Sequence, residues 1–436
     1  MASKVYFQDD RAMANEDSLV AKMVTLFEAA GFEEIIKPGD TVAIKVHMGE
    51  HNNTGYLRPV YVRALVEKVK SLGGEPVVMD TTTLTYLPFP ARATALDHLK
   101  TVERNGFNSG TVGCPIIIAD GYIGADDVRV DLPEGFVLKE QYVATGIALA
   151  DAMIVLAHFK GHPLGTYGGS IKNMGVGCVS KRGKHNLHLG GDPRWGLKAR
   201  PFHPHLCRGK SCDKWMLCDN VCPEGCFHVT ETSIEWDASR CTGCFACLFV
   251  TMPCGVTGVA DEFFDISAAA IADSALAVTK TFKLGKIGYL NMAIDISPWC
   301  DCVPFSDRPF VPNLGAFSSR DPVAIDVACI DMSRQSFGMP GSIAEEKGVM
   351  FPGIPKLSAC GSFVGVSENI QTNTGDRIGL GSKQYELIRP EAGDPTKFLY
   401  TQVPTGIKFA PLYKMKPVYP EGGFKRAAEV PIEEVR

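Results

Sequence analysis

The sequence predicts an α/β protein with a doubly wound, mostly parallel sheet and an inserted cysteine-rich module. Over the first 160 residues, short apolar runs alternate with amphipathic helical patterns. This alternation is typical of parallel strands covered by helices on both faces. Nine of the fifteen cysteines then fall between Cys207 and Cys254, and the helix–strand pattern resumes after them. The cysteine-rich segment is therefore expected to be an insertion into one α/β core.

The expected elements follow from periodicity and from turn residues. β-Branched runs predict strands at 41–46, 75–80, 115–120, 152–157, 285–296 and 311–320. Amphipathic patterns predict helices at 16–31, 57–74, 91–106, 140–151, 260–282 and 321–336. We divide the chain into four parts: core residues 1–204, a module at 205–258, core residues 259–336 and an irregular Gly/Pro-rich extension at 337–436.

The composition is that of an ordinary soluble globular protein, with 45% hydrophobic and 21% charged residues. The net charge is −5 and the isoelectric point is near 6.1, which gives no electrostatic basis for binding nucleic acid or an acidic membrane. No stretch is apolar and uncharged over the roughly 18 residues that a membrane helix needs. The N-terminal residues lack the apolar core of a signal peptide, so we expect a cytoplasmic protein.

The cysteine spacing predicts an iron–sulfur cluster. Cys241, Cys244 and Cys247 form a C-x2-C-x2-C run, and Cys222 precedes a proline upstream. In two-cluster ferredoxins, the cysteine before proline ligates the cluster of the other run. We therefore predict a ferredoxin-like module with one [4Fe–4S] cluster on Cys222, Cys241, Cys244 and Cys247. Four thiolates also bind zinc, but this spacing favours iron–sulfur.

The ligand positions of a second cluster are incomplete. The same pattern assigns them to Cys212, Trp215, Cys218 and Thr251, and two of these four residues carry no thiol. One interpretation is a degenerate site in which Trp215 fills the space of the lost cluster. The alternative is a second, non-standard cluster, because non-standard loops also carry clusters. Three further cysteines could then replace the missing thiolates: Cys207, Cys226 and Cys254.

Polar side chains follow four of the predicted strands. Ligands bind at the carboxyl ends of strands in open α/β sheets, so these side chains predict a pocket for substrate binding and proton transfer. Asp80 and Asp120 are alternatively turn-capping residues. We assign the candidate catalytic role to five residues: His47, His51, His158, Lys160 and His162.

A glycine-rich loop follows the last of these strand ends and surrounds Lys172. Such loops let backbone N–H groups approach an anion, and a lysine adds charge. We assign Gly168, Gly169 and Lys172, together with Asp80, to cofactor or substrate binding. A structural loop is the alternative interpretation.

Cys300 and Cys302 form a C-x-C pair after another predicted strand. Such a pair can ligate a metal or cycle between thiol and disulfide. Free buried cysteines are also common, so a purely structural role is the alternative.

Three stretches, at residues 44–86, 157–184 and 300–326, resemble the domain-of-unknown-function family 362. The resemblance implies an α/β core with an inserted ferredoxin-type module and names no reaction. The chain departs from the two full cluster runs of such modules at Trp215 and Thr251. Residues 158–177 are also similar to the glycine-and-lysine loop of the lactate racemase family, which binds a nickel-pincer nucleotide. Lys172 would lie near that family's cofactor lysine, and we do not carry the nickel cofactor over.

The first functional hypothesis is an iron–sulfur oxidoreductase or electron-transfer protein. Its cluster would pass single electrons between a redox partner protein and a small, anionic molecule in the His/Lys-rich pocket. One alternative is a redox-neutral isomerase or lyase that acts on a small anion and carries a structural cluster. Another is a carrier or assembly factor for a metal or cofactor.

Overall fold

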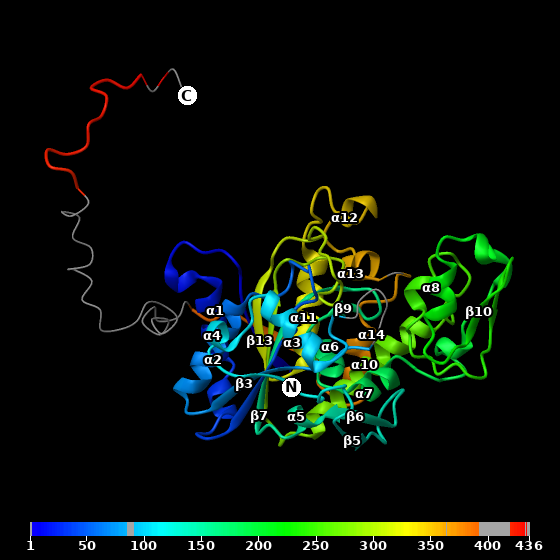
Figure 1. The fold of residues 1–436 in the computed structure, drawn as a ribbon. Helices are drawn as coiled ribbons and strands as arrows, with labels where there is room; N and C mark the ends of the chain where they lie inside the picture. Colours follow the sequence, from blue (N-terminus) through cyan, green and yellow to red (C-terminus); the bar gives the residue numbers. More distant parts are fainter. Residues whose placement is uncertain (1, 85–90, 363, 392–418, 432, 434–436) are drawn as a thin grey trace.

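The computed structural model describes residues 2–84, 91–362, 364–391, 419–431 and 433. Its centre is an eight-stranded sheet with the strand order β14-β1-β13-β12-β7-β2-β3-β4 (Figure 1). The strands are β1 (Ser3–Gln8), β2 (Thr41–Lys45), β3 (Glu75–Asp80), β4 (Ile116–Ile118), β7 (Ala152–His158), β12 (Ile287–Ala293), β13 (Gly315–Ser319) and β14 (Tyr385–Ile388). Neighbouring strands are parallel except where β13 pairs with β1 and β12. The predicted α/β class with a mostly parallel sheet is confirmed.

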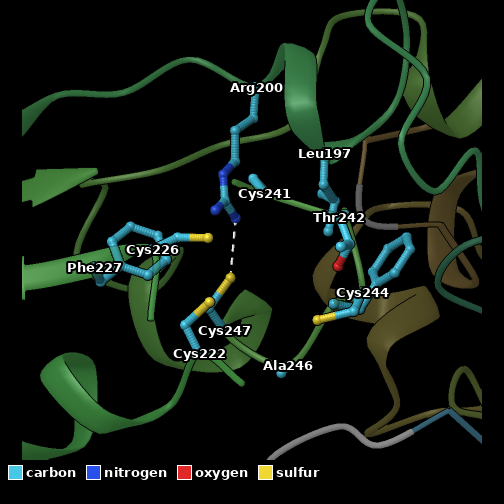
Figure 2. Close-up of a pocket in the computed structure, with 12 residues that line it drawn as sticks. Leu197, Arg200, Cys222, Cys226, Phe227, Cys241, Thr242, Cys244, Ala246 and Cys247 are labelled. Carbon is cyan, nitrogen blue, oxygen red and sulfur yellow. Dashed lines mark hydrogen bonds between the residues drawn. The ribbon is translucent and has the colours of Figure 1, made fainter. Parts of the chain in front are cut away.

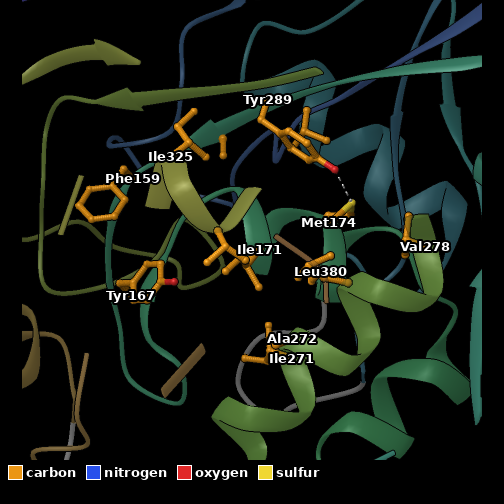
Figure 3. Close-up of a cluster of buried hydrophobic side chains, with 14 of the residues drawn as sticks. Phe159, Tyr167, Ile171, Met174, Ile271, Ala272, Val278, Tyr289, Ile325 and Leu380 are labelled. Carbon is orange, nitrogen blue, oxygen red and sulfur yellow. Dashed lines mark hydrogen bonds between the residues drawn. The ribbon is translucent and has the colours of Figure 1, made fainter. Parts of the chain in front are cut away.

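Helices cover both faces of this sheet. Along β7, Ile154 and Leu156 pack in one core with α1 (Leu19–Ala29) and α2 (Pro59–Ser71). The alternate residues Met153 and Val155 pack in a second core on the opposite face. The helices of this second core are α6 (Ser170–Gly177), α10 (Phe263–Lys280) and α11 (Pro322–Gln335) (Figure 3). A strand buried on both faces explains the continuous apolar run at 152–157.

One predicted helix is wrong. Residues 140–144 form β6 (Glu140–Ala144), which pairs antiparallel with β5 (Asp127–Asp131), and only α5 (Thr145–Ala148) is helical. The pairing partner lies upstream and has few apolar residues, so the local pattern carried no sign of this hairpin. Tertiary pairing overrides local helical periodicity here.

Two strands of the main sheet, β1 and β14, were not predicted. Strand β14 lies at residues 385–388, so the α/β core continues beyond residue 336, where we expected an irregular extension. Between these points the chain forms α12 (Ile343–Glu346), α13 (Lys356–Cys360) and α14 (Ile370–Arg377). Residues 392–418 of the expected extension lie outside the described residues.

Residues 205–258, which we call the cysteine-rich lobe, project to one side of the core (Figure 1). The lobe contains α8 (Trp215–Asn220), α9 (Leu248–Thr251) and a hairpin of β10 (Phe227–Val229) and β11 (Ile234–Trp236). A small apolar cluster that includes Phe227 and Ile234 holds it together. Its ferredoxin-like character and the four-part division of the chain stay predictions. In the described part of the chain, no helix has the length and apolarity to cross a membrane.

Candidate functional site at the carboxyl ends of the strands

Five thiols of the cysteine-rich lobe line one small cavity (Figure 2). They include all four predicted cluster ligands, Cys222, Cys241, Cys244 and Cys247. The fifth is Cys226. Burial, and then a hydrogen bond with Cys222, raises the pKa of Cys226 to about 12. The structure therefore brings the predicted ligands together and adds a neutral thiol beside them.

The thiols of this cavity lie near one another without forming a compact group of three metal-ligating atoms. Among the described residues, three such atoms lie within 4.8 Å of one another only at His162, Cys300 and Cys302.

A buried cation, Arg200, lies against the cluster cavity. Its Nη1 donates to Cys247 Sγ at 3.1 Å, as Figure 2 shows. Its guanidinium carbon lies 4.7 Å from the Trp236 ring centroid and 5.3 Å from that of Phe227. Burial raises the pKa of Cys247, and the positive charge of Arg200 opposes that rise. Arg200 is thus placed to stabilise negative charge on the ligand sulfur.

The remaining four thiols of the lobe form a second group: Cys207, Cys212, Cys218 and Cys254. Helix α8, which carries Cys218, contacts both α9 and the short helix η5 (Gly209–Ser211) that precedes Cys212. Burial, followed by the charges of Cys254, Cys207 and Cys212, raises the pKa of Cys218 to about 11. These thiols therefore lie close enough to interact.

Neither non-cysteine position of the degenerate pattern is free to bind metal. Thr251 is fully buried, and its hydroxyl contacts the Thr257 hydroxyl at 2.7 Å and the Cys247 carbonyl at 3.1 Å. The Trp215 ring lies 5.8 Å from Lys210 Nζ.

A cavity of about 510 Å³ lies between the carboxyl ends of the strands and the cysteine-rich lobe. Eight predicted site residues line it: His47, Asp80, His158, Lys160, His162, Gly168, Gly169 and Lys172. His51 does not line it. Its backbone N–H instead donates to Glu50 Oε1 at 2.9 Å.

Asp301 organises the centre of this pocket. Its carboxylate lies 3.0 Å from His158 Nδ1 and 3.1 Å from Lys160 Nζ. Burial alone would raise the pKa of Asp301, but the charges of His158 and Lys160 outweigh it and lower the pKa. The second ring nitrogen of His158, Nε2, contacts the Ile294 carbonyl at 2.7 Å. Both nitrogens of His158 are therefore engaged, and this histidine positions Asp301.

A second buried ion pair joins Lys45 and Asp80, with Nζ and Oδ1 3.1 Å apart. Lys45 also donates to Asn173 Oδ1 at 2.9 Å. Burial works to raise the pKa of Asp80, but the charge of Lys45 and the nearby His47 lower it overall. Asp80 is thus a charged partner for Lys45, which links β2 and β3 to helix α6.

Two groups in the pocket keep capacity for a ligand. Lys172 forms no ion pair or hydrogen bond within the described residues, and burial and the charge of Lys160 lower its pKa to about 7. His47 Nδ1 accepts from the Gly49 N–H at 3.0 Å, so the ring proton belongs on Nε2. That buried Nε2 has no hydrogen-bond partner in the described part of the chain.

Two N–H groups that follow the glycine pair of the glycine-rich loop are held by Asp326. Asp326 accepts from the N–H groups of Ser170 and Ile171 at 2.8 and 3.0 Å, at the start of α6. A Cβ at Gly169 would lie 2.5 Å from Asp326 Oδ1, so glycine is needed for this close approach. The N–H groups of Ser170 and Ile171 are therefore held by the protein's own carboxylate, whereas Gly168, Gly169 and Lys172 line the pocket.

Several residues that line or support the pocket were not among the predicted site residues, and they include Arg92, Lys184, His188, Phe245 and Asp301. Asp301 lies inside the C-x-C pair, which could have drawn attention to it. Phe245 directly follows Cys244 and lines both the cluster cavity and the pocket. His188 packs edge-on against it, with ring centroids 5.3 Å apart.

A family model described as a domain of unknown function (DUF362) matches residues 42–331. Six solved chains match significantly. One is a crystal structure of a Thermotoga maritima protein, with 11% identity, a TM-score of 0.33, and coverage of 66% of this chain and 52% of that one. Another is the lactate racemase apoprotein from Thermoanaerobacterium thermosaccharolyticum, with 12% identity, a TM-score of 0.37, and coverage of 78% and 59%.

The chain thus spans 52% and 59% of the lengths of these two structures. The second of them carries the family name to which residues 158–177 show a local resemblance. No curated protein sequence matches significantly.

Proposed function

Because the chain belongs to the DUF362 family, whose description names no reaction, we propose a function from the residues of the chain itself. The protein is an iron–sulfur oxidoreductase that reduces or oxidises a small, anionic molecule in the pocket. Cys222, Cys241, Cys244 and Cys247 hold a [4Fe–4S] cluster, which supplies or accepts one electron at a time when bound.

This proposal is supported mainly by the wall that the thiol-lined cavity shares with the pocket. Phe245 lines both the cluster cavity and the pocket, and its neighbour Cys244 is a proposed cluster ligand. A molecule in the pocket would be separated from that ligand by about one side chain. Such proximity suits direct electron exchange and serves no purpose for a cluster that only stabilises the lobe.

The charge of the pocket favours an anionic ligand. Lys45, Lys160 and Arg92 are each paired with a carboxylate. Lys184 donates to the Thr81 hydroxyl and the Val179 carbonyl, and Lys172 has no such partner among the described residues. Lys172 and Lys184 therefore have no carboxylate partner among the described residues, unlike the other three cations. A carboxylate or phosphate group would supply the missing negative charge.

Proton transfer requires side chains in the pocket that are not already held by an ion pair or a hydrogen bond. Reduction of an organic molecule consumes protons as well as electrons. Lys172 has a pKa of about 7, close to the value at which a group both gains and loses a proton readily. His47 offers Nε2–H to the pocket. Lys172 transfers the proton, and His47 donates a hydrogen bond that orients the substrate.

The second thiol group supports a second cluster. Cys207 and Cys254 supply thiols near Cys212 and Cys218, in place of the Trp215 and Thr251 positions of the usual pattern. We assign these four thiols a second, non-standard [4Fe–4S] cluster, which receives electrons from a redox partner protein at the outer side of the lobe.

Iron and acid-labile sulfide, counted per chain on anaerobically prepared protein, test the cluster assignment. We expect about eight of each for two clusters. Cys222→Ser and Cys212→Ser should each remove about half of the iron, whereas Cys226→Ser should keep nearly all of it. Retention of a full complement in Cys222→Ser would contradict the ligand assignment, and stoichiometric zinc in place of iron would contradict the cluster itself.

Anaerobic screening of small carboxylates and phosphates against the reduced protein tests the reaction class. An oxidoreductase should show reoxidation of its clusters on addition of one of these anions. Turnover of an anion with no change in cluster oxidation state would replace the proposal with a redox-neutral isomerase or lyase.

A further inference from the structure

Cys300 and Cys302 are joined by a disulfide, and both line the pocket. Cys300 is buried at 1% exposure, whereas Cys302 is partly exposed. The residue between them, Asp301, is fixed by His158 and Lys160. The two sulfurs are therefore held at the pocket by a rigid anchor, and Cys302 is the more accessible of the two.

A purely structural role explains little about this disulfide. A disulfide stabilises a fold mainly by restricting the unfolded chain, and the restriction grows with the length of the closed loop. The sequence separation here is only 2, so the bridge constrains almost no chain. Its position at a pocket, in a core that is otherwise held by two large apolar clusters, points to a chemical role.

The tautomer of His162 distinguishes a redox role from a metal site. His162 Nδ1 accepts from the N–H groups of Leu164 and Gly165 at 3.2 and 2.9 Å. The neutral ring therefore carries its proton on Nε2, which lies 4.0 Å from Cys302 Sγ. A metal ion bound at Nε2 would need the lone pair there and a proton on Nδ1, where two backbone donors already point. His162 is thus a hydrogen-bond donor to the sulfur.

We propose that Cys300 and Cys302 form a redox-active pair that cycles between disulfide and dithiol at the pocket. Two electrons, delivered singly by a reduced iron–sulfur cluster, break the S–S bond. Cys302 becomes a thiolate that accepts a hydrogen bond from His162 Nε2–H, and Cys300 takes one proton from water. The reverse step returns two electrons and one proton to a two-electron acceptor in the pocket. The pair thereby collects two single electrons and passes them on together. The proposal depends on the proposed function only for the source of these electrons.

Equilibration of the full-length, cluster-loaded protein in dithiol–disulfide buffers tests the pair. Thiols are trapped by alkylation and assigned by mass spectrometry of the peptide that contains residues 300–302. Two new thiols per chain should appear reversibly as the buffer becomes more reducing. Cys114→Ser, which removes a buried cysteine next to β4, is the matched control and should leave this transition unchanged.

His162→Asn tests the positioning role of the histidine. Without the hydrogen bond to the Cys302 thiolate, alkylation of Cys302 at neutral pH should slow about tenfold, with the two-thiol stoichiometry retained. A pair that stays oxidised in the folded protein under strong dithiol, or that stays reduced under oxidant, would overturn the proposal. So would one zinc ion per chain that Cys302→Ser removes without loss of iron.

The electron source is tested separately. Reduced methyl viologen should generate the two thiols in the wild-type protein and fail to do so at the same rate in Cys244→Ser. If buffer titration reveals the pair but Cys244→Ser changes nothing, the disulfide cycle stands and the proposed electron path fails. If the clusters form and cycle but no thiols appear at residues 300 and 302, the disulfide cycle alone fails.

Discussion

At the residue scale, one lysine without a partner among the described residues dominates the chemistry of the pocket. Other cations of the pocket are held by carboxylates or hydroxyls, but burial and the neighbouring Lys160 lower the pKa of Lys172 to about 7. Its charge therefore changes near neutral pH, which makes it the group through which pH should act on ligand binding.

We expect anion affinity to fall as pH rises through about 7, because Lys172 loses its proton over that range. Isothermal titration with sulfate, whose own charge is constant between pH 6 and pH 8.5, measures this. Lys172→Met should weaken binding at pH 6 by about tenfold, the loss of one charge-assisted hydrogen bond. Lys172→Arg, which stays charged, should remove the pH dependence. A wild-type affinity that is constant over this range would exclude Lys172 from the anion site.

The lowered pKa of Lys172 also predicts how the free energy of unfolding changes with pH. A lysine whose pKa falls from 10.5 unfolded to about 7 folded destabilises the folded state most below pH 7. The penalty disappears as pH rises from about 7 towards 10.5, because only the unfolded state then holds the proton. Lys172→Met should therefore raise the free energy of unfolding most at pH 6 and least near pH 10, as measured by urea denaturation. A stabilisation that grows with pH would contradict this.

Arg200 provides a prediction for the cluster. Its guanidinium donates to Cys247 Sγ, so we expect it to favour the more negative, reduced state of the proposed cluster. Arg200→Met should lower the midpoint potential of one cluster, as followed by anaerobic titration with electron paramagnetic resonance. Arg194→Met removes an exposed cation that stacks on Trp195 and should leave both potentials unchanged. An unchanged potential in Arg200→Met would argue against a cluster on Cys247.

At the element scale, the start of α6 depends on a carboxylate from α11. Asp326 accepts from the N–H groups of Ser170 and Ile171 and from Asn291 Nδ2 at 2.7 Å. Burial raises the pKa of Asp326 to about 6, and these hydrogen bonds oppose the rise. The helix that carries Lys172 is therefore fixed to the core at its first turn.

Asp326→Asn should lower the free energy of unfolding by about 1–3 kcal/mol, because the new amide N–H₂ faces existing donors. It should also weaken phosphate binding, since the position of Lys172 depends on this helix start. Asp273→Asn is the matched control. Asp273, on α10, accepts from the N–H groups of Phe136, Val137 and Leu138 and from none at the start of α6. The control should lose stability and keep anion affinity, and equal loss of affinity in both variants would contradict the positioning role.

Strands and metal-ligating residues could be predicted where residues close together in the sequence form the pattern. The cysteine spacing identified four thiols that share a cavity, and apolar runs identified most parallel strands. The role of Asp326 could not be predicted, because this residue lies some 150 positions after the N–H groups of Ser170 and Ile171 that it accepts from. The hairpin at 127–144 was missed for a similar reason. The position of Arg200 depends on tertiary folding and left no pattern in the sequence, whereas Cys207 and Cys254 were already candidates for a second cluster.

At the scale of the whole molecule, one edge of the sheet is formed by β14 and β1, which come from opposite ends of the described core. Strand β1 pairs antiparallel with β13, with Val5 opposite Ser319, and parallel with β14, with Val5 opposite Leu387. Deletion of residues 1–8 would remove both ladders and leave the edge of β13 unpaired. We expect a lower melting temperature and concentration-dependent aggregation in light scattering. A truncated protein with wild-type melting and no aggregation would show that β1 is dispensable.

The same pairing bears on the biosynthesis of the chain. Strand β1 leaves the ribosome long before β13, whose pairing with β1 begins at residue 316. During most of translation this segment has no native neighbour, and contacts across such sequence distances form slowly. Synthesis must pass residue 388 before the ladder between β1 and β14 can form, so a chain that stops earlier would expose an incomplete sheet to chaperones and proteases.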